Sequence, residues 1–397
     1  MSSFKTSLLA VAIGASLLTA CNREATPAVD PAPAPVTDAA VSPPAPAPAA
    51  STQAPADAQM QSVLDALAKL GGKPAESLDP VEARKQPTPA DAVGEVLKAQ
   101  GKPTTPEAVG KITNTTFPGP GGAVPVRIYT PANAPAGTPL PVILYIHGGG
   151  WVIADLDSYD ASPRAIANAA GAIVVSTHYR QGPEHKFPAA HDDTLAAYKW
   201  TLANAAKWNG DPKKIALVGE SAGGNMAAYI AIAARDQKLQ APLHQVLIYP
   251  VANNDLNSPS YVENANAKPL NKPMIEWFVK HYLNSAAEAA DPRIALVKQP
   301  NLAGLAPATI VLAQIDPLRS DGEAYAEKLK AAGTPVDVIR FDGVTHEFFG
   351  MGAVVDKAKS AVQQVGMKLK SAFAGTVPTS TTAPAATSTT TAPAPAA

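Results

Sequence analysis

The stretch that decides the fold is IALVGESAGGNMAAYI, residues 215 to 230. An apolar run, IALV, leads into the small residues around Ser221, and an alanine-rich run typical of a helix follows. This pattern matches the G-x-S-x-G elbow, in which a tight strand-to-helix turn exposes the serine hydroxyl at the carboxyl end of the strand. The alternative is that Ser221 only caps the helix, because serine is a common N-cap residue.

The rest of the chain alternates short apolar runs with helical ones. Seven runs predict strands: VPVRIYT (124–130), LPVILYI (140–146), AIVVSTHY (172–179), IALV (215–218), QVLIYP (245–250), TIVLAQI (309–315) and VDVIRF (336–341). Several are apolar throughout, as strands covered on both faces are. Because helical patterns separate them, the sequence predicts an α/β fold with a doubly wound, mostly parallel sheet.

Composition divides the 397-residue chain. Residues 25 to 58 are dominated by Pro and Ala, and residues 376 to 397 by Thr, Pro, Ala and Ser. Such stretches lack large apolar side chains, so we expect both to be disordered. The expected organisation is a leader (1–20), a tether (21–58), N-terminal helices (59–110), an α/β domain (111–375) with a long insertion (252–305), and a tail (376–397). The net charge of −1, without a basic run, gives no indication of nucleic-acid binding.

The single cysteine, Cys21, follows the apolar run LLAVAIGASLL (8–18). This run of 11 residues is shorter than the roughly 20 that span a membrane, so it predicts a secretory signal. LLTAC resembles a bacterial lipobox, in which the cysteine is lipid-modified after cleavage; the alternative is an ordinary signal peptide. The lipobox predicts a domain anchored in the cell envelope, at the outer membrane because Asn22 follows, and facing the periplasm or the exterior. A lone cysteine excludes an internal disulfide and a Cys-based zinc site.

A serine hydroxyl is a poor nucleophile unless a base takes its proton. His346 follows the last predicted strand at its carboxyl end, the edge where open α/β sheets carry their chemistry. By contrast, His244 precedes its strand, His281 lies within a helical pattern, and His178 lies in or just after a strand. His346 is therefore the predicted base.

Two further components complete this chemistry. Asp316 ends the strand TIVLAQI at the same edge, where a carboxylate would hold the imidazole in the right tautomer. Asp321 is instead expected to cap the next helix. The motif HGGGW (147–151) follows another strand, and the N–H groups of Gly148 and Gly149, with that of Ala222, predict an oxyanion hole. The alternatives for this glycine run are a flexible linker or a phosphate loop, but no G-x-x-x-x-G-K-[ST] is present.

With these residues, the chain resembles the bacterial hormone-sensitive-lipase-like esterases of the α/β-hydrolase fold. The similarity spans about residues 59 to 370 and includes HGGGW, HYRQGPEHKFPAAHDD, GESAGGN, DPLRSDGEAYAEKL and FDGVTHEFFGM. The order Ser221, Asp316, His346 is also the order of that family's triad. Glu220 stands where the family usually has aspartate, a departure that leaves the triad intact.

The resemblance implies an eight-stranded sheet with a helical cap built from residues 59–110 and the insertion 252–305. Trp151, Trp277 and Phe278 are then candidate pocket residues. It also implies a small-molecule substrate: short-chain carboxylic esters, hydrolysed through an acyl-enzyme and without a metal or cofactor. The alternatives are a lipase acting on longer acyl chains, an amidase or peptidase, and a hydrolase-fold binding protein without turnover.

Overall fold

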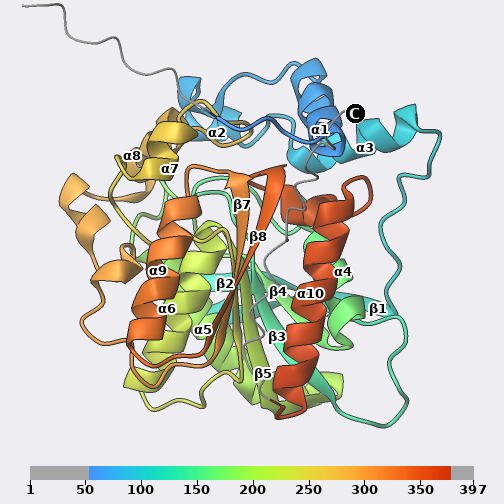
Figure 1. The fold of residues 1–397 in the computed structure, drawn as a ribbon. Coiled ribbons are helices and arrows are strands. Elements are labelled where there is room, and N and C mark those ends of the chain that lie inside the picture. Colours follow the sequence, from blue (N-terminus) through green and yellow to red (C-terminus); the bar gives the residue numbers. More distant parts are fainter. Residues whose placement is uncertain (1–52, 377–397) are drawn as a thin grey trace, which may run out of the picture. The chain divides into compact units, whose positions relative to one another are not determined.

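The computed structural model describes residues 53–376 (Figure 1). The predicted leader, Cys21, nearly all of the tether and the tail from residue 377 lie outside the described residues. Within residues 53–376, no helix has both the length and the apolarity to cross a membrane.

An eight-stranded sheet occupies the centre, in the order β1-β2-β4-β3-β5-β6-β7-β8. The β1–β2 and β2–β4 pairs are antiparallel, and every other neighbouring pair is parallel. The strands are β1 (Lys111–Gly119), β2 (Gly122–Thr130), β3 (Leu140–Ile146), β4 (Ile173–Thr177), β5 (Gly210–Glu220), β6 (Gln245–Ile248), β7 (Ala308–Ile315) and β8 (Val336–Thr345). The predicted α/β class and mostly parallel sheet are confirmed. Sequence reasoning missed only β1, an edge strand in which Phe117 is the one buried side chain.

Successive strand residues pack into two apolar layers because side chains alternate across a sheet. From β3, Val142, Leu144 and Ile146 join one layer, and Ile143 and Tyr145 join the other. The helices of the first layer are α5 (Ala189–Asn204), α6 (Ala222–Asp236) and α9 (Arg319–Ala331); those of the second are α4 (Ala161–Ala170) and α10 (Asp356–Phe373). Figure 1 shows the two groups on opposite faces of the sheet.

Two segments outside the sheet and its flanking helices contact each other. The first holds α1 (Ala58–Lys69), η1 (Ala75–Ser77), α2 (Pro80–Ala83) and α3 (Pro89–Ala99); the second holds α7 (Pro259–Glu263), α8 (Lys272–Tyr282), η3 (Ala286–Ala290) and η4 (Leu296–Lys298). The indole N–H of Trp277 donates to the carbonyl of Leu78 (3.0 Å), and the Asn271 amide donates to Glu76 (2.9 Å). α1–α3, α7 and α8 lie at the same end of the sheet in Figure 1.

Candidate active site

The turn between β5 and α6 places Ser221 in a strained conformation, with φ 56° and ψ −118°. A Cβ on Gly219 would come within 2.1 Å of the Gly223 carbonyl oxygen, and one on Gly223 within 2.1 Å of the Ile146 carbonyl oxygen. Only glycine fits at either position, which explains the spacing of the motif. Ser221 occupies the N-cap position of α6 but makes no side-chain cap bond, so capping is not the role of its hydroxyl.

Ser221, Asp316 and His346 form a continuous hydrogen-bonded chain. The Nδ1–H of His346 donates to Asp316 Oδ2 (2.8 Å), and this leaves Nε2 free to accept from the Ser221 hydroxyl (3.0 Å). Asp316 is itself fixed by the backbone N–H of Leu318, which donates to Oδ1 (2.8 Å). Because the three residues follow β5, β7 and β8, the parallel sheet brings them together at its carboxyl edge.

The electrostatic surroundings favour a protonated His346. Burial alone would lower the pKa of the imidazole, but the charge of Asp316 and its hydrogen bond to Nδ1 oppose this effect. The carboxylates of Glu347 and Glu220 act in the same direction as Asp316, and the pKa of His346 lies above its ordinary value. The site therefore stabilises the imidazolium that forms when Ser221 loses its proton.

Backbone donors lie beside Ser221. A Cβ on Gly148 would be 3.1 Å from Ser221 Cβ, which places the HGGGW loop against the serine. Within residues 53–376, the N–H groups of Gly148, Gly149 and Ala222 donate to no protein acceptor. Free N–H groups next to a nucleophile are suited to bind the negative oxygen of a tetrahedral intermediate.

A small cavity of about 80 Å³ opens onto Ser221. Trp151 and Phe278 line it, as predicted, together with Gly150. A Cβ on Gly150 would come within 2.2 Å of the Phe278 ring, so this ring lies directly against the glycine loop. Most of the other lining side chains are apolar: Val251, Leu256, Tyr261, Leu270, Ile275, Val279, Leu283, Ala289, Ile294 and Leu318.

Two predicted positions need correction. Trp277 does not line this cavity; its indole N–H bonds the carbonyl of Leu78, because successive residues of α8 point in different directions. Asp321 does not cap α9 either. It lies inside that helix and accepts the N–H groups of Ala252 (3.0 Å) and Asn253 (2.9 Å).

The other candidate histidines are structural. His147 stacks on Tyr179, with ring centroids 4.4 Å apart, and burial lowers its pKa to about 3. His244 bonds Thr309 (2.8 Å), and burial lowers its pKa to about 4. Both rings stay neutral near neutral pH, and within residues 53–376 their hydrogen bonds go to groups other than Ser221.

Sequence reasoning missed a cluster of acidic and tyrosine side chains around His346. Glu220 accepts hydrogen bonds from Tyr145 (2.6 Å) and from Tyr249, whose ring lies 4.4 Å from the His346 ring between centroids. Glu347 accepts a hydrogen bond from Tyr159 (2.6 Å). The one available signal was the presence of a glutamate beside each of two triad residues.

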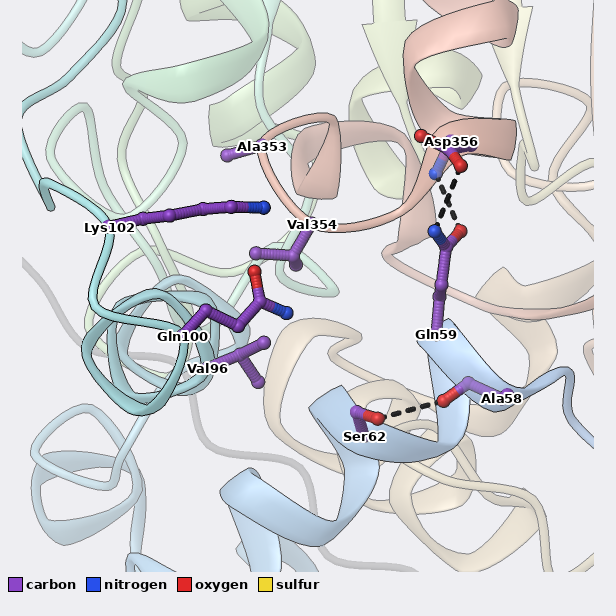
Figure 2. A pocket seen from close by; sticks show the side chains of 9 residues that line it. All are labelled: Ala58, Gln59, Ser62, Val96, Gln100, Lys102, Ala353, Val354 and Asp356. Carbon is purple, nitrogen blue, oxygen red and sulfur yellow. Dashed lines mark hydrogen bonds between the residues drawn. The ribbon is translucent and has the colours of Figure 1, made fainter.

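A larger cavity, of about 270 Å³, lies apart from Ser221 between α1, α3 and the start of α10 (Figure 2). Some of its polar groups are paired: Gln59 and Asp356 exchange two hydrogen bonds of 2.9 Å, and Ser62 donates to the carbonyl of Ala58. No triad residue lines it. In the part of the chain that is described, no group of three or more His, Cys, Asp or Glu side chains is arranged to hold a metal ion.

Comparisons with known proteins agree with this geometry. A family model described as the alpha/beta hydrolase fold matches residues 143–350. The chain is 41% identical over 253 residues to the carboxylesterase NlhH of Mycobacterium tuberculosis, covering 63% of this chain and 79% of the relative. It is 34% identical over 293 residues to an ethyl acetate hydrolase of Pseudomonas putida, covering 74% and 90%.

A solved structure shows the same fold. An esterase from Pyrobaculum calidifontis aligns with a TM-score of 0.70 at 34% identity, over 80% of this chain and 99% of that one. The sequence match, the structural match and the eight-stranded sheet agree. The chain belongs to the α/β-hydrolase family.

Proposed function

We propose that this chain is a serine carboxylesterase that hydrolyses small carboxylic esters through an acyl-enzyme. The observation that carries the proposal is the unbroken hydrogen-bonded chain from Asp316 through His346 to Ser221. Its named relatives include carboxylesterases and other ester hydrolases, which supports the same reaction here.

In the first half of the reaction, Ser221 Oγ attacks the ester carbonyl carbon while its proton passes to Nε2 of His346. The carbonyl oxygen becomes negative and is bound by the N–H groups of Gly148, Gly149 and Ala222. The carbon–oxygen bond to the alcohol then breaks, and Nε2 returns the proton to the departing alcohol. In the second half, water repeats these steps on the acyl-enzyme and releases the acid.

The size of the cavity supports short acyl chains. About 80 Å³ at Ser221 is far below the roughly 300–1,000 Å³ of pockets that enclose drug-sized ligands. One relative is named for ethyl acetate, a small ester. We therefore assign acetyl- to butyryl-sized esters as the preferred substrates.

The segments 59–110 and 252–305 are proposed to form a cap over this cavity, and we call them the cap segments. Support comes from the second segment, which supplies cavity residues such as Tyr261, Ile275 and Phe278. The first segment contacts the second through Glu76 and Leu78. The cap segments thus set the size of the ester that reaches Ser221.

A lipid anchor at Cys21 is also part of the proposal, and its support is the sequence LLTAC after an apolar run. The Pro/Ala-rich residues 25–58 would act as a tether reaching roughly 100 Å at about 3.1 Å per residue. Because Asn22 follows the cysteine, we assign the anchor to the outer membrane of a bacterial envelope.

The deciding experiment compares wild type with Ser221→Ala on p-nitrophenyl esters from acetate to palmitate. We expect serine-dependent hydrolysis that is fastest for the shortest chains. A maximum at long chains would instead identify a lipase. Equal, negligible rates for both proteins would identify a hydrolase-fold binding protein and contradict the proposal.

A further inference from the structure

His346 lies between two carboxylates rather than one. Asp316 accepts from Nδ1 on one side of the ring, while Oε1 of Glu347 lies 3.8 Å from Nε2 on the other. Nε2 is the atom that takes the proton from Ser221 and passes it on. Glu347 is thus the charged side chain that faces the proton-transferring nitrogen.

The carboxylate of Glu347 is held in this place. The Tyr159 hydroxyl donates to Oε1 (2.6 Å), and a Cβ on Gly148 would come within 2.4 Å of that hydroxyl. Tyr159 therefore connects Glu347 to the glycine loop beside Ser221. The backbone of Glu347 has φ 70°, a left-handed conformation that non-glycine residues rarely adopt and that is concentrated at functional sites.

Several titratable groups surround Glu347. They are Tyr145 of β3, Tyr159, Tyr179 after β4, Glu220 at the end of β5, Tyr249 after β6, Asp316 after β7 and His346 itself. Glu220 accepts from two tyrosines, one of which packs on the imidazole ring. Burial raises the pKa of Glu347, and the neighbouring His346 and the Tyr159 hydroxyl oppose this shift.

We propose that Glu347 is a second positioning residue for His346, whose carboxylate stabilises the imidazolium during proton transfer. The proposal rests on the serine esterase mechanism given above. When the bond between Ser221 Oγ and the carbonyl carbon forms, the hydroxyl proton moves to Nε2 and the ring becomes positive. The negative charge of Glu347 then attracts the ring more strongly than in the resting enzyme. An interaction that strengthens only on the way to the transition state raises kcat.

The test is the pH dependence of p-nitrophenyl acetate hydrolysis by wild type, Glu347→Gln, Glu347→Asp and Glu220→Gln. Glutamine keeps the length of the side chain and an oxygen for Tyr159 but removes the charge. We expect kcat to fall by about tenfold, with KM changed by less than about twofold. Since hydrolysis requires neutral His346, loss of the charge should also move the acid limb of kcat/KM to lower pH, by about 0.5–1 unit.

The conservative and matched variants make the result specific. Glu347→Asp keeps the charge, so it should restore most of the wild-type acid limb. Burial raises the pKa of Glu220 to about 7 and its oxygens face two tyrosines, so Glu220→Gln removes little charge on the acid limb, which should move by less than half as much. Equal shifts for both glutamine variants, or an unchanged profile for Glu347→Gln, would overturn the proposal. If Glu347→Gln does not fold, Glu347→Asp decides alone. A wild-type kcat in Glu347→Asp, together with an acid limb moved to lower pH by the full 0.5–1 unit (about the shift expected for loss of the charge), would overturn the proposal.

Ser221→Ala separates this inference from the mechanism beneath it. Full activity in that variant would refute the serine mechanism, whatever Glu347 does. An inactive Ser221→Ala beside a wild-type profile in Glu347→Gln would refute only the role of Glu347.

Discussion

The sheet edge and the cap segments both reach Ser221, but they are held by different interactions. At the edge, Ser221, Asp316 and His346 are 5%, 0% and 3% exposed and lie in one hydrogen-bonded chain. The second cap segment, 252–305, presents mainly apolar side chains to the cavity. The polar bonds that join the cap segments to the rest of the chain are both buried, as between Ser260 and the carbonyl of Pro317, and part-exposed, as at Arg84, whose side chain is 28% exposed. The edge thus has the geometry to move a proton, and the proposed role of the cap segments is to select the substrate.

This contrast predicts that substitutions at the edge reduce kcat, whereas those in the cap segments change KM and substrate preference. Ser221→Ala should have the largest effect, a loss of about 10⁶-fold in kcat, because the nucleophile acts as a unit with its base. Steady-state hydrolysis of p-nitrophenyl acetate measures it. Ser62→Ala, at an exposed position of α1, is the control and should match wild type. Activity within a hundredfold of wild type in Ser221→Ala would mean that another group attacks the ester.

Asp316→Asn should rank second, with a loss of about 10⁴-fold in kcat, because an asparagine favours the wrong imidazole tautomer. Asp316 also raises the pKa of His346, so residual activity should persist to lower pH than in wild type. The pH profile of kcat/KM tests both parts. Asp342→Asn, with a side chain that is 61% exposed, is the control. A profile unchanged in position would show that Asp316 does not act on His346.

Phe278→Ala should show what the cap segments contribute. Removing the ring against Gly150 enlarges the cavity, so the rate of octanoate hydrolysis relative to butyrate hydrolysis should rise about tenfold. One extra methylene in an apolar pocket changes kcat/KM by about this factor or more. The chain-length series measures this ratio. Trp277→Ala is the matched control. Trp277 is the neighbour of Phe278 but does not line the cavity, so this substitution should leave the ratio unchanged. The same ratio change in both variants would mean that the cap loosens as a whole.

Phe278 and Trp277 also show where sequence reasoning stops. The triad positions were predictable because each follows a parallel strand, and the carboxyl ends of such strands meet at one edge. The direction of a helical side chain depends instead on how the whole helix packs, so adjacent aromatic residues of α8 could not be told apart. Glu347 was equally hidden, because its role depends on a left-handed backbone and on Tyr159, 188 residues away.

Arg84→Met should have a smaller effect. The guanidinium donates to both oxygens of Glu184 (2.8 and 2.7 Å) and to the carbonyls of Val152 and Gly182, and so joins α2 to the loops beside Trp151. Exposed ion pairs contribute less than about 1 kcal/mol, so with the carbonyl bonds we expect a loss of about 1–2 kcal/mol. KM should rise a few-fold and kcat should stay within about twofold.

Thermal unfolding and steady-state kinetics measure these effects, and Lys85→Met supplies the control. Lys85, just after α2, pairs with Glu82 and has a side chain that is 61% exposed, so its loss should change neither Tm nor KM. A large fall in kcat for Arg84→Met would break the proposed division between edge and cap.

Cys21→Ser should have no effect on catalysis, because the triad and cavity lie within residues 53–376 and the tether separates them from the cysteine. What should change is location: wild type should sediment with membranes, and the variant should be released. A single acyl chain binds membranes only marginally. If the modified cysteine carries the whole anchor, its replacement should release the protein completely. Membrane retention of Cys21→Ser would refute the lipoprotein assignment. A changed KM would show instead that the membrane helps to present the ester to the cap segments.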